Sequence, residues 1–185
     1  MSDRLSCREP SEADLADDAV QHLVDLINRV YDVAESGMWR RPGTRTNRDQ
    51  IRELLRDKRL ILADRDGTIV GSVNVNLLNE NVAEFGMLAA DPDHRGLGIG
   101  SMLVNAAEEW ARSMNRGTMR LELLTPRSWR HPSKEFLKAW YARLGYVPQF
   151  TEPLEKTHPE LVGELATECD FTVWHKPLST DTLVQ

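Results

Sequence analysis

With 185 residues, 41% of them hydrophobic and 28% charged, the chain has the size and composition of one globular domain with a buried core. Its formal net charge of −6 argues against a general nucleic-acid binder and against a protein held on an anionic membrane surface. No apolar run approaches the roughly 20 residues of a membrane span, and the first residues lack the apolar core of a signal peptide.

The N-terminal part of the chain predicts one short strand and two helices. A strand fits Leu5–Arg8, and from Asp14 to about Ser36 apolar residues recur at helical spacing, which predicts a helix with one buried stripe. A basic loop follows this helix. Asn47 is then placed to cap a second helix, whose inner face carries Ile51, Leu54 and Leu55.

Three strands follow as a meander. Residues 60–63 and Thr68–Leu77 are joined by Asp-Arg-Asp-Gly, a strong hairpin signal. Val82–Ala90 is mostly apolar and fits a buried strand. The middle strand alternates, so we expect one side with Ile69, Val73, Val75 and Leu77 and another with Ser72, Asn74 and Asn76.

The segment after Val82–Ala90 combines a turn with a glycine-rich helix start. Asp-Pro-Asp at residues 91–93 breaks the strand, because proline fixes φ and restricts the residue before it. Gly96, Gly98 and Gly100 then leave the free N–H groups of a helix N-terminus uncovered, and Arg95 adds a positive charge. This pattern predicts a pyrophosphate-binding cradle. A turn that only packs a helix against a strand is the alternative.

Two common phosphate motifs do not fit this segment. A dinucleotide-binding fingerprint requires a third glycine where Ser101 stands, and it follows the first strand of its domain rather than the fourth. A P-loop requires Gly-Lys followed by Ser or Thr, which is absent here.

The C-terminal half predicts two helices and three strands. Strands fit residues 119–124, 146–150 and 169–174, with a loop over 151–166 that holds one helical turn near residues 160–165. We expect the helix after the cradle to bury Leu103, Ala107, Trp110 and Met114. Ser133 is placed to cap the other helix, with an inner face of Phe136, Leu137, Trp140, Tyr141 and Leu144.

The element order predicts a mixed α/β (α+β) fold: a largely antiparallel sheet of six or seven strands flanked by about four helices. We expect one domain over residues 1–177 and a flexible C-terminal tail over residues 178–185. Cys7 and Cys169 lie far apart, and the five histidines show no ligand spacing. We therefore expect no metal site and two reduced thiols, as in a cytoplasmic protein; a disulfide between the two ends is the less favoured alternative.

Two motifs within this order resemble the GNAT superfamily of acyl-CoA-dependent N-acyltransferases. Arg-Gly-Leu-Gly-Ile-Gly at residues 95–100 is similar to its Arg/Gln-x-x-Gly-x-Gly/Ala signature. Trp-Tyr-Ala-Arg-Leu-Gly-Tyr at residues 140–146 resembles its second marker, an aromatic-Tyr-x-x-x-Gly-aromatic sequence. The resemblance implies that strands four and five splay apart and that acetyl-CoA, the acyl-donor cosubstrate, lies in the gap.

The resemblance also implies which residues bind the cosubstrate. Backbone N–H groups of residues 95–101 would hold the pyrophosphate, and residues 88–90 would pair with pantetheine as an added strand does. An N–H near Leu88 would face the thioester carbonyl. The implied cofactor-binding residues are Leu88, Ala89, Ala90, Arg95, Gly96, Leu97, Gly98, Ile99, Gly100 and Ser101.

Acyl transfer to an amine requires a proton acceptor, because the ammonium form dominates at pH 7. Glu84 stands where some relatives place this base; its alternatives are an outward-facing carboxylate without a catalytic role and a base made of waters. Glu122 is a second candidate. Tyr141 matches the family's general acid, which protonates the leaving thiolate, and it also fits an amphipathic core tyrosine.

The helix that carries Tyr141 departs from the family pattern. Many relatives have Asn seven residues before the tyrosine, where this chain has Lys134, followed by Lys138. Either lysine could reach a CoA phosphate, but we expect both on a solvated helix face. Trp39, Arg40 and Arg45 lie in a loop that often shapes the acceptor pocket in relatives, although loop anchoring is the favoured interpretation here.

The sequence thus predicts an N-acetyltransferase that moves acetyl from acetyl-CoA to a primary amine by direct attack in a ternary complex. The alternative is a non-catalytic acyl-CoA-binding or sensor domain. The acceptor stays open between a small-molecule amine and a peptide or protein amine. We expect no nucleic-acid or membrane partner. Dimers are common among relatives, so a homodimer is one possible state, and the sequence leaves the oligomeric state open.

Overall fold

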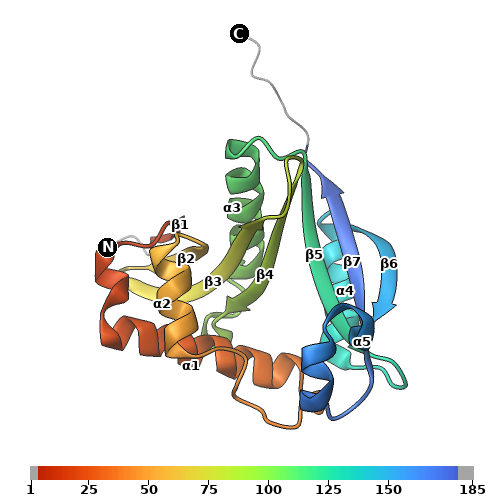
Figure 1. The fold of residues 1–185 in the computed structure, drawn as a ribbon. Coiled ribbons are helices and arrows are strands. Elements are labelled where there is room, and N and C mark those ends of the chain that lie inside the picture. Colours follow the sequence, from red (N-terminus) through yellow and green to blue (C-terminus); the bar gives the residue numbers. More distant parts are fainter. Residues whose placement is uncertain (1–3, 179–185) are drawn as a thin grey trace.

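The computed structural model describes residues 4–178, which form one twisted seven-stranded sheet with helices on both faces (Figure 1). The strand order is β1-β2-β3-β4-β5-β7-β6, and every neighbouring pair is antiparallel except the parallel pair β4–β5. The mixed fold predicted from the sequence is confirmed. The strands are β1 Leu5–Arg8, β2 Leu60–Arg65, β3 Thr68–Leu77, β4 Val82–Ala90, β5 Thr118–Pro126, β6 Val147–Pro153 and β7 Cys169–Pro177.

Four longer helices cover the two faces of the sheet. One buried cluster joins α1 and α2 to one face, and a larger cluster joins α3 and α4 to the other. The helices are α1 Asp17–Ala34, α2 Arg48–Arg56, α3 Ile99–Ser113, α4 Pro132–Arg143 and the short α5 Leu154–Thr157. The 3-10 turns are η1 Glu12–Leu15, η2 Pro92–His94 and η3 Pro159–Glu164. Asn47 caps α2 as predicted, with its side chain accepting the Gln50 N–H.

Strands β4 and β5 pair over only three residues and then diverge (Figure 1). The pairing ends at Glu84, so in the described part of the chain residues 85–90 have no partner on β5. On its other edge, β4 places Met87 and Leu88 opposite the single residue Val73 of β3. This bulge holds Met87 at φ +48°, a left-handed conformation that is uncommon outside glycine. The splayed strands implied by the resemblance are confirmed.

The alternation predicted for β3 is wrong at its first position. Ile69 packs into the α1–α2 cluster, whereas Val73 and Val75 pack into the α3–α4 cluster. The cause is a bulge opposite β2, where Val70 is the extra residue and reverses the sides of the strand.

The burial predicted for α4 is also wrong in part. The helix is capped by His131, whose Nδ1 accepts the Ser133 N–H, rather than by Ser133. Phe136 is 61% exposed, whereas Lys134 is only 3% exposed. An ion pair described below explains how a lysine lies inward. Met114, the C-cap residue of α3, was likewise predicted to be buried and is exposed.

The C-terminal region has more structure than the predicted loop. Residues 151–166 contain the end of β6, α5 and η3, and the helical turn expected near residues 160–165 corresponds to η3. Cys7 and Cys169 are free thiols. Leu178 is buried and its N–H donates to the Gly117 carbonyl, and the other residues of the predicted tail lie outside the described residues. No helix among residues 4–178 is long and apolar enough to cross a membrane.

Candidate active site

The segment between β4 and α3 has the geometry of an anion cradle. Gly96 and Gly98 adopt φ +83° and +72°, which favour glycine, and Gly98 is the N-cap of α3. The first intrahelical bond runs from Met102 N–H to Gly98 O, so the N–H groups of residues 99–101 have no partner within the helix. Arg95 is exposed and, among the described residues, forms no ion pair.

Helix α1 anchors the turn in front of this cradle. The Arg29 guanidinium lies 2.7 Å from Asp91 Oδ1 and 3.0 Å from Asp93 Oδ2. The Asp91 side chain also accepts the Asp93 N–H and so begins η2. The cradle is therefore fixed from both sides, by the turn and by the start of α3. We call residues 88–101 the glycine wall.

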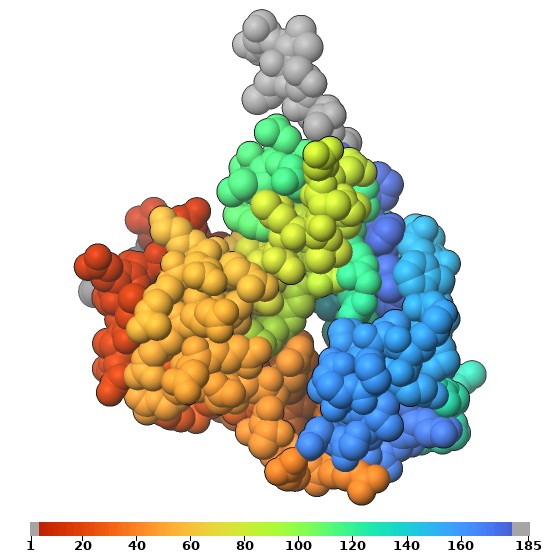
Figure 2. Space-filling model, in the orientation of Figure 1, coloured from red at the N-terminus to blue at the C-terminus, as the bar shows by residue number. Residues whose placement is uncertain are grey.

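A single cavity of about 1390 Å³ extends from the glycine wall across the gap between β4 and β5. Figure 2 shows this hollow between the loop after α1, the segment of α5 and η3, and the strands β4 and β5. Of the ten residues implied as cofactor-binding, eight line the cavity. The other two are Ala89, which packs beneath α1, and Leu97, whose side chain is exposed.

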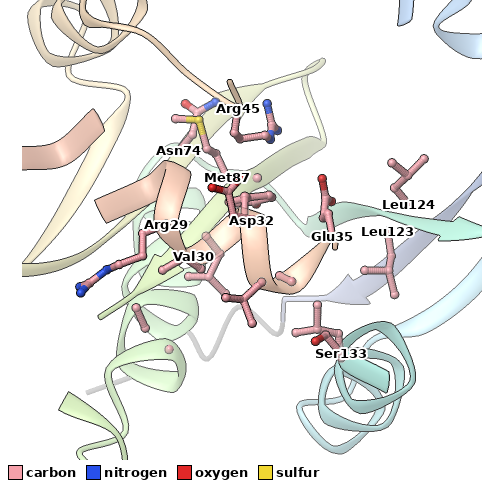
Figure 3. Close-up of a pocket in the computed structure, with 18 of the residues that line it drawn as sticks. Arg29, Val30, Asp32, Glu35, Arg45, Asn74, Met87, Leu123, Leu124 and Ser133 are labelled. Atoms are coloured by element: carbon pink, nitrogen blue, oxygen red, sulfur yellow. The ribbon is translucent and has the colours of Figure 1, made fainter. Parts of the chain in front are cut away.

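The opposite side of the cavity is built from side chains of distant segments. They come from α1, the loop after it, the turn before β2, and α4 (Figure 3 labels two of them). We call this set the side-chain wall: Tyr31, Glu35, Arg45, Arg59 and Lys134.

Tyr141 of α4 lies at the edge of the cavity. It lines the cavity, is 6% exposed, and packs against Phe85 and Tyr146 with ring centroids 6.0 Å apart in each case. Burial, followed by the neighbouring Tyr31, raises the pKa of the Tyr141 hydroxyl well above its usual range. Tyr141 is thus a protonated hydroxyl held by core packing at the edge of the cavity, so its packing and catalytic interpretations are compatible.

Tyr31 is a cavity residue that sequence reasoning missed. It was assigned only to the apolar stripe of the first helix, and no sequence signal separates its hydroxyl from that stripe. Burial raises the pKa of Tyr31 to about 12, while Arg45 and a hydrogen bond with the Leu88 backbone oppose this rise. The Arg45 guanidinium carbon lies 5.0 Å from the Tyr31 ring centroid. Tyr31 therefore links the side-chain wall to Leu88 of the glycine wall.

Glu84 also reaches the cavity, where it is part of a charged row. Arg120 lies opposite Glu84 in the β4–β5 register and forms ion pairs with both Glu84 and Glu122. His158 Nε2 lies 3.5 Å from Glu122 Oε2. Burial raises the pKa of Glu84 above its ordinary value, and Arg120 opposes that rise. The two carboxylates predicted as candidate bases are therefore brought together around one arginine.

A buried ion pair closes the floor of the cavity. Lys134 Nζ lies 2.7 Å from Glu35 Oε1, with side chains that are 4% and 7% exposed. The Trp39 indole N–H donates to the other oxygen of Glu35. The predicted solvated position of Lys134 is wrong, because this contact with α1 draws it inward. Lys138 is partly exposed and pairs with Glu135 at 2.8 Å on its own helix.

Arg40 of the basic loop and His94 of η2 both contact neighbouring residues. Arg40 donates to the Leu165 carbonyl and its backbone N–H to the Glu164 carbonyl, so it anchors the loop, as expected. His94 Nδ1 lies 3.5 Å from Asp91 Oδ2. Within residues 4–178, no group of three or more His, Cys, Asp or Glu side chains could hold a metal ion.

Comparison with known proteins gives a consistent set of similarities. The sequence model of the family described as "Acetyltransferase (GNAT) family" matches residues 22–146. The chain is 26% identical over 144 residues to the amino-acid acetyltransferase of Shewanella oneidensis and 29% identical over 110 residues to that of Mannheimia succiniciproducens. These matches cover 77% and 59% of this chain but only 28% and 23% of the relatives, so the chain spans about a quarter of their length.

Two solved structures illustrate the likeness in fold. YncA from Salmonella typhimurium, solved with its cofactor acetyl-CoA, superposes with a TM-score of 0.67 at 14% identity and 98% coverage of both chains. N-acetylglutamate synthase from Neisseria gonorrhoeae, complexed with coenzyme A and N-acetyl-glutamate, superposes with a TM-score of 0.64 at 15% identity, covering 97% of this chain and 36% of that one.

Proposed function

The chain belongs to the GNAT acetyltransferase family, and on that premise we propose that it transfers an acetyl group from acetyl-CoA to a primary amine by direct attack in a ternary complex. The observation that carries this proposal is the shared cavity. The exposed cradle, Tyr141 and Glu84 all line it, and a mere binding module would need only the cradle.

The glycine wall has the chemistry that a diphosphate cosubstrate needs. The N–H groups of residues 99–101 have no partner within the helix, the glycines lack side chains, and Arg95 has no ion pair within residues 4–178. All three features favour a bound anion. The free edge of β4 at residues 88–90 offers backbone groups to the pantetheine amides. When bound there, acetyl-CoA supplies the activated acetyl thioester.

Leu88 N–H is the donor we assign to the developing oxyanion. The Leu88 backbone lowers the pKa of Tyr31, so it faces the Tyr31 hydroxyl, and the thioester oxygen would take the place of that hydroxyl. The bulge at Met87 supports this assignment, because it releases residues 87 and 88 from a regular ladder with β3.

Glu84 and Tyr141 would handle the two protons. Glu84 takes a proton from the acceptor ammonium, directly or through water, and the free amine then attacks the carbonyl carbon. The C–S bond breaks and Tyr141 O–H donates its proton to the sulfur. The nitrogen, positively charged after the attack, then returns a proton through water to the Tyr141 oxygen, which leaves the neutral amide and the free thiol. The raised pKa of Glu84 makes its carboxylate a stronger base, and the raised pKa of Tyr141 keeps its hydroxyl protonated until the thiolate forms.

The test is Tyr141→Phe, assayed by release of free thiol from acetyl-CoA with a panel of amines. The panel includes amino acids, because the curated relatives bear the name amino-acid acetyltransferase. We expect kcat to fall about a hundredfold while the Kd for CoA changes little. Tyr146→Phe is the matched control: its hydroxyl donates to Glu108 at 2.9 Å, and Tyr146 does not line the cavity.

Two results would overturn the proposal. Tight CoA binding without thiol release for any amine would favour the acyl-CoA sensor instead. A Tyr141→Phe variant as fast as the parent would leave Tyr141 with a packing role only. A cytoplasmic location, a homodimer and a single domain over residues 1–177 stay predictions from the sequence.

A further inference from the structure

Five arginines line the cavity, and they differ in their partners. Arg29 pairs with Asp91 and Asp93, and Arg41 pairs with Glu164 at 2.9 Å. Arg45, Arg59 and Arg95 form no ion pair with any carboxylate among residues 4–178. Arg95 belongs to the glycine wall, which leaves Arg45 and Arg59 as two uncompensated cations on the side-chain wall.

Arg59 and Asn74 are adjacent and both have unsatisfied polar atoms. The Val75 N–H donates to the Arg59 carbonyl at 2.8 Å, and Leu60 lies opposite Asn74 in the β2–β3 register. Within the described residues, Arg59 Nε and Asn74 Oδ1 are buried without a hydrogen-bond partner. Leaving such atoms unpaired costs free energy, so a ligand that pairs both would be favoured.

Arg45 approaches the same region from the loop after α1. It lies over the Tyr31 ring, and Figure 3 places Arg45 and Asn74 on the same side of the cavity, across from Leu123 and Leu124. Within residues 4–178, no acidic residue near them forms an ion pair with Arg45 or Arg59. Asp32 accepts the Gly43 N–H, and Glu53 forms no ion pair with the described residues.

The neighbouring part of the cavity has the opposite charge. Asn74 lies opposite Gly86, and Asn76 lies opposite Glu84, so Asn74 and Glu84 are diagonal neighbours on one face of the sheet. Glu122 follows on the adjacent strand. An ammonium between Glu84 and Asn74 Oδ1 would thus share the cavity with the two guanidinium groups.

We propose that Arg45 and Arg59 form an anion subsite for a carboxylate on the acceptor, so that the acceptor is an amino acid rather than a simple amine. This inference rests on the proposed function and specifies the substrate class of the same site. The planar guanidinium binds carboxylate through two parallel hydrogen bonds, and such charge-assisted bonds are stronger than neutral ones. Asn74 Oδ1 accepts a hydrogen bond from the ammonium, beside Glu84.

The experiment compares substrates that differ only in the carboxylate. The pairs are alanine and ethylamine, and phenylalanine and phenethylamine. For the wild type we expect kcat/KM to be at least about tenfold higher for the amino acid of each pair, since one hydrogen bond to a charged group accounts for roughly that ratio. Aminoalkylphosphonates of the same length test whether the subsite prefers a phosphonate to a carboxylate.

Arg45→Gln and Arg59→Gln then locate the effect. Each should lower kcat/KM for the amino acid by about 10- to 100-fold, mainly through KM, and leave the decarboxylated amine within about twofold. Arg41→Gln is the matched control, because Glu164 already neutralises that arginine and no loss of discrimination is expected. Arg45→Lys and Arg59→Lys keep the charge and should retain part of the preference, even where a Gln variant folds poorly.

Several results would overturn the proposal while the proposed function stands. They are equal use of both members of each pair, an equal loss for both members in the Gln variants, and a preference for phosphonates. If no amine is acetylated, the proposed function itself fails. The subsite is then tested by calorimetric binding of each pair to the protein saturated with CoA, where equal affinities would exclude a carboxylate subsite.

Discussion

The two sides of the cavity are built in opposite ways. The glycine wall is one continuous stretch of 14 residues, and its binding groups are backbone N–H groups exposed by glycine. The side-chain wall collects groups from distant segments, such as Lys134 and Glu35, which are 99 positions apart in the sequence. A site made of backbone groups keeps its ligand when neighbouring side chains are substituted. In a site made of side chains, each substitution alters which ligand binds. One cavity can therefore keep its donor and vary its acceptor.

The largest effect is expected when the buried ion pair of the side-chain wall is removed. Lys134→Met leaves the Glu35 carboxylate buried without its cation, so we expect the free energy of unfolding to fall by about 3–5 kcal/mol, measured by urea denaturation at pH 7. Lys138→Met on the same helix removes a partly exposed pair and should cost less than about 1 kcal/mol.

The double variant Glu35→Gln with Lys134→Met separates lost charge from lost packing. It should recover part of the stability, because no unpaired carboxylate is then buried. Equal losses for Lys134→Met and Lys138→Met would contradict the difference between a buried and an exposed lysine on α4.

The same two walls explain what the sequence could and could not predict. The glycine wall depends on local φ preferences and on the positions of proline and glycine. The turn and the helix start within residues 91–100 could therefore be predicted without a structure. Tyr31 and Lys134 could not be placed in this way. A tyrosine in an apolar stripe is normally interpreted as a core residue, and a lysine on a weakly amphipathic helix as a solvent-exposed one. Only the contact of Tyr31 with β4 and that of Lys134 with Glu35 at the end of α1 change these interpretations. Glu84 lies in the predicted strand and lines the cavity, but its partner Arg120 depends on the parallel register of β4 and β5.

The next effect concerns the charged row at the edge of the side-chain wall. Glu84→Gln should lower kcat by about a hundredfold, because the amide cannot accept the ammonium proton. In the parent, activity should fall as the pH drops through the pKa of Glu84, which burial raises above its ordinary value, and the variant should lose this acidic limb of the pH–rate profile.

The stability of Glu84→Gln is its internal control. A folded-state pKa above the unfolded one means that the ionised carboxylate disfavours folding at neutral pH, so the variant should be as stable as the parent or more so. Arg120 keeps Glu122 as a partner. An unchanged kcat with an unchanged pH profile would assign the proton transfer to water or to Glu122.

A smaller effect is expected at the glycine wall. Gly98→Val places a β-branched residue at φ +72°, which strains the N-cap of α3 and turns its N–H groups away from the anion. We expect the Kd for acetyl-CoA, measured by calorimetry, to rise about tenfold, or about 1.4 kcal/mol. Gly163→Ala is the control, since a Cβ there meets no atom within 4 Å and its φ is not left-handed. An unchanged Kd for Gly98→Val would move the pyrophosphate away from residues 96–101.

The smallest effect tests the revised orientation of α4. Phe136 was predicted on the inner face of this helix and is 61% exposed, so Phe136→Ala should change the free energy of unfolding by less than about 0.5 kcal/mol. Leu137, the next residue, packs against the core, and Leu137→Ala should cost about 2 kcal/mol. The two positions differ by 100° around the helix axis. A large loss at Phe136 with none at Leu137 would mean that α4 is rotated, and Lys134 would then face solvent and leave Glu35 without its partner.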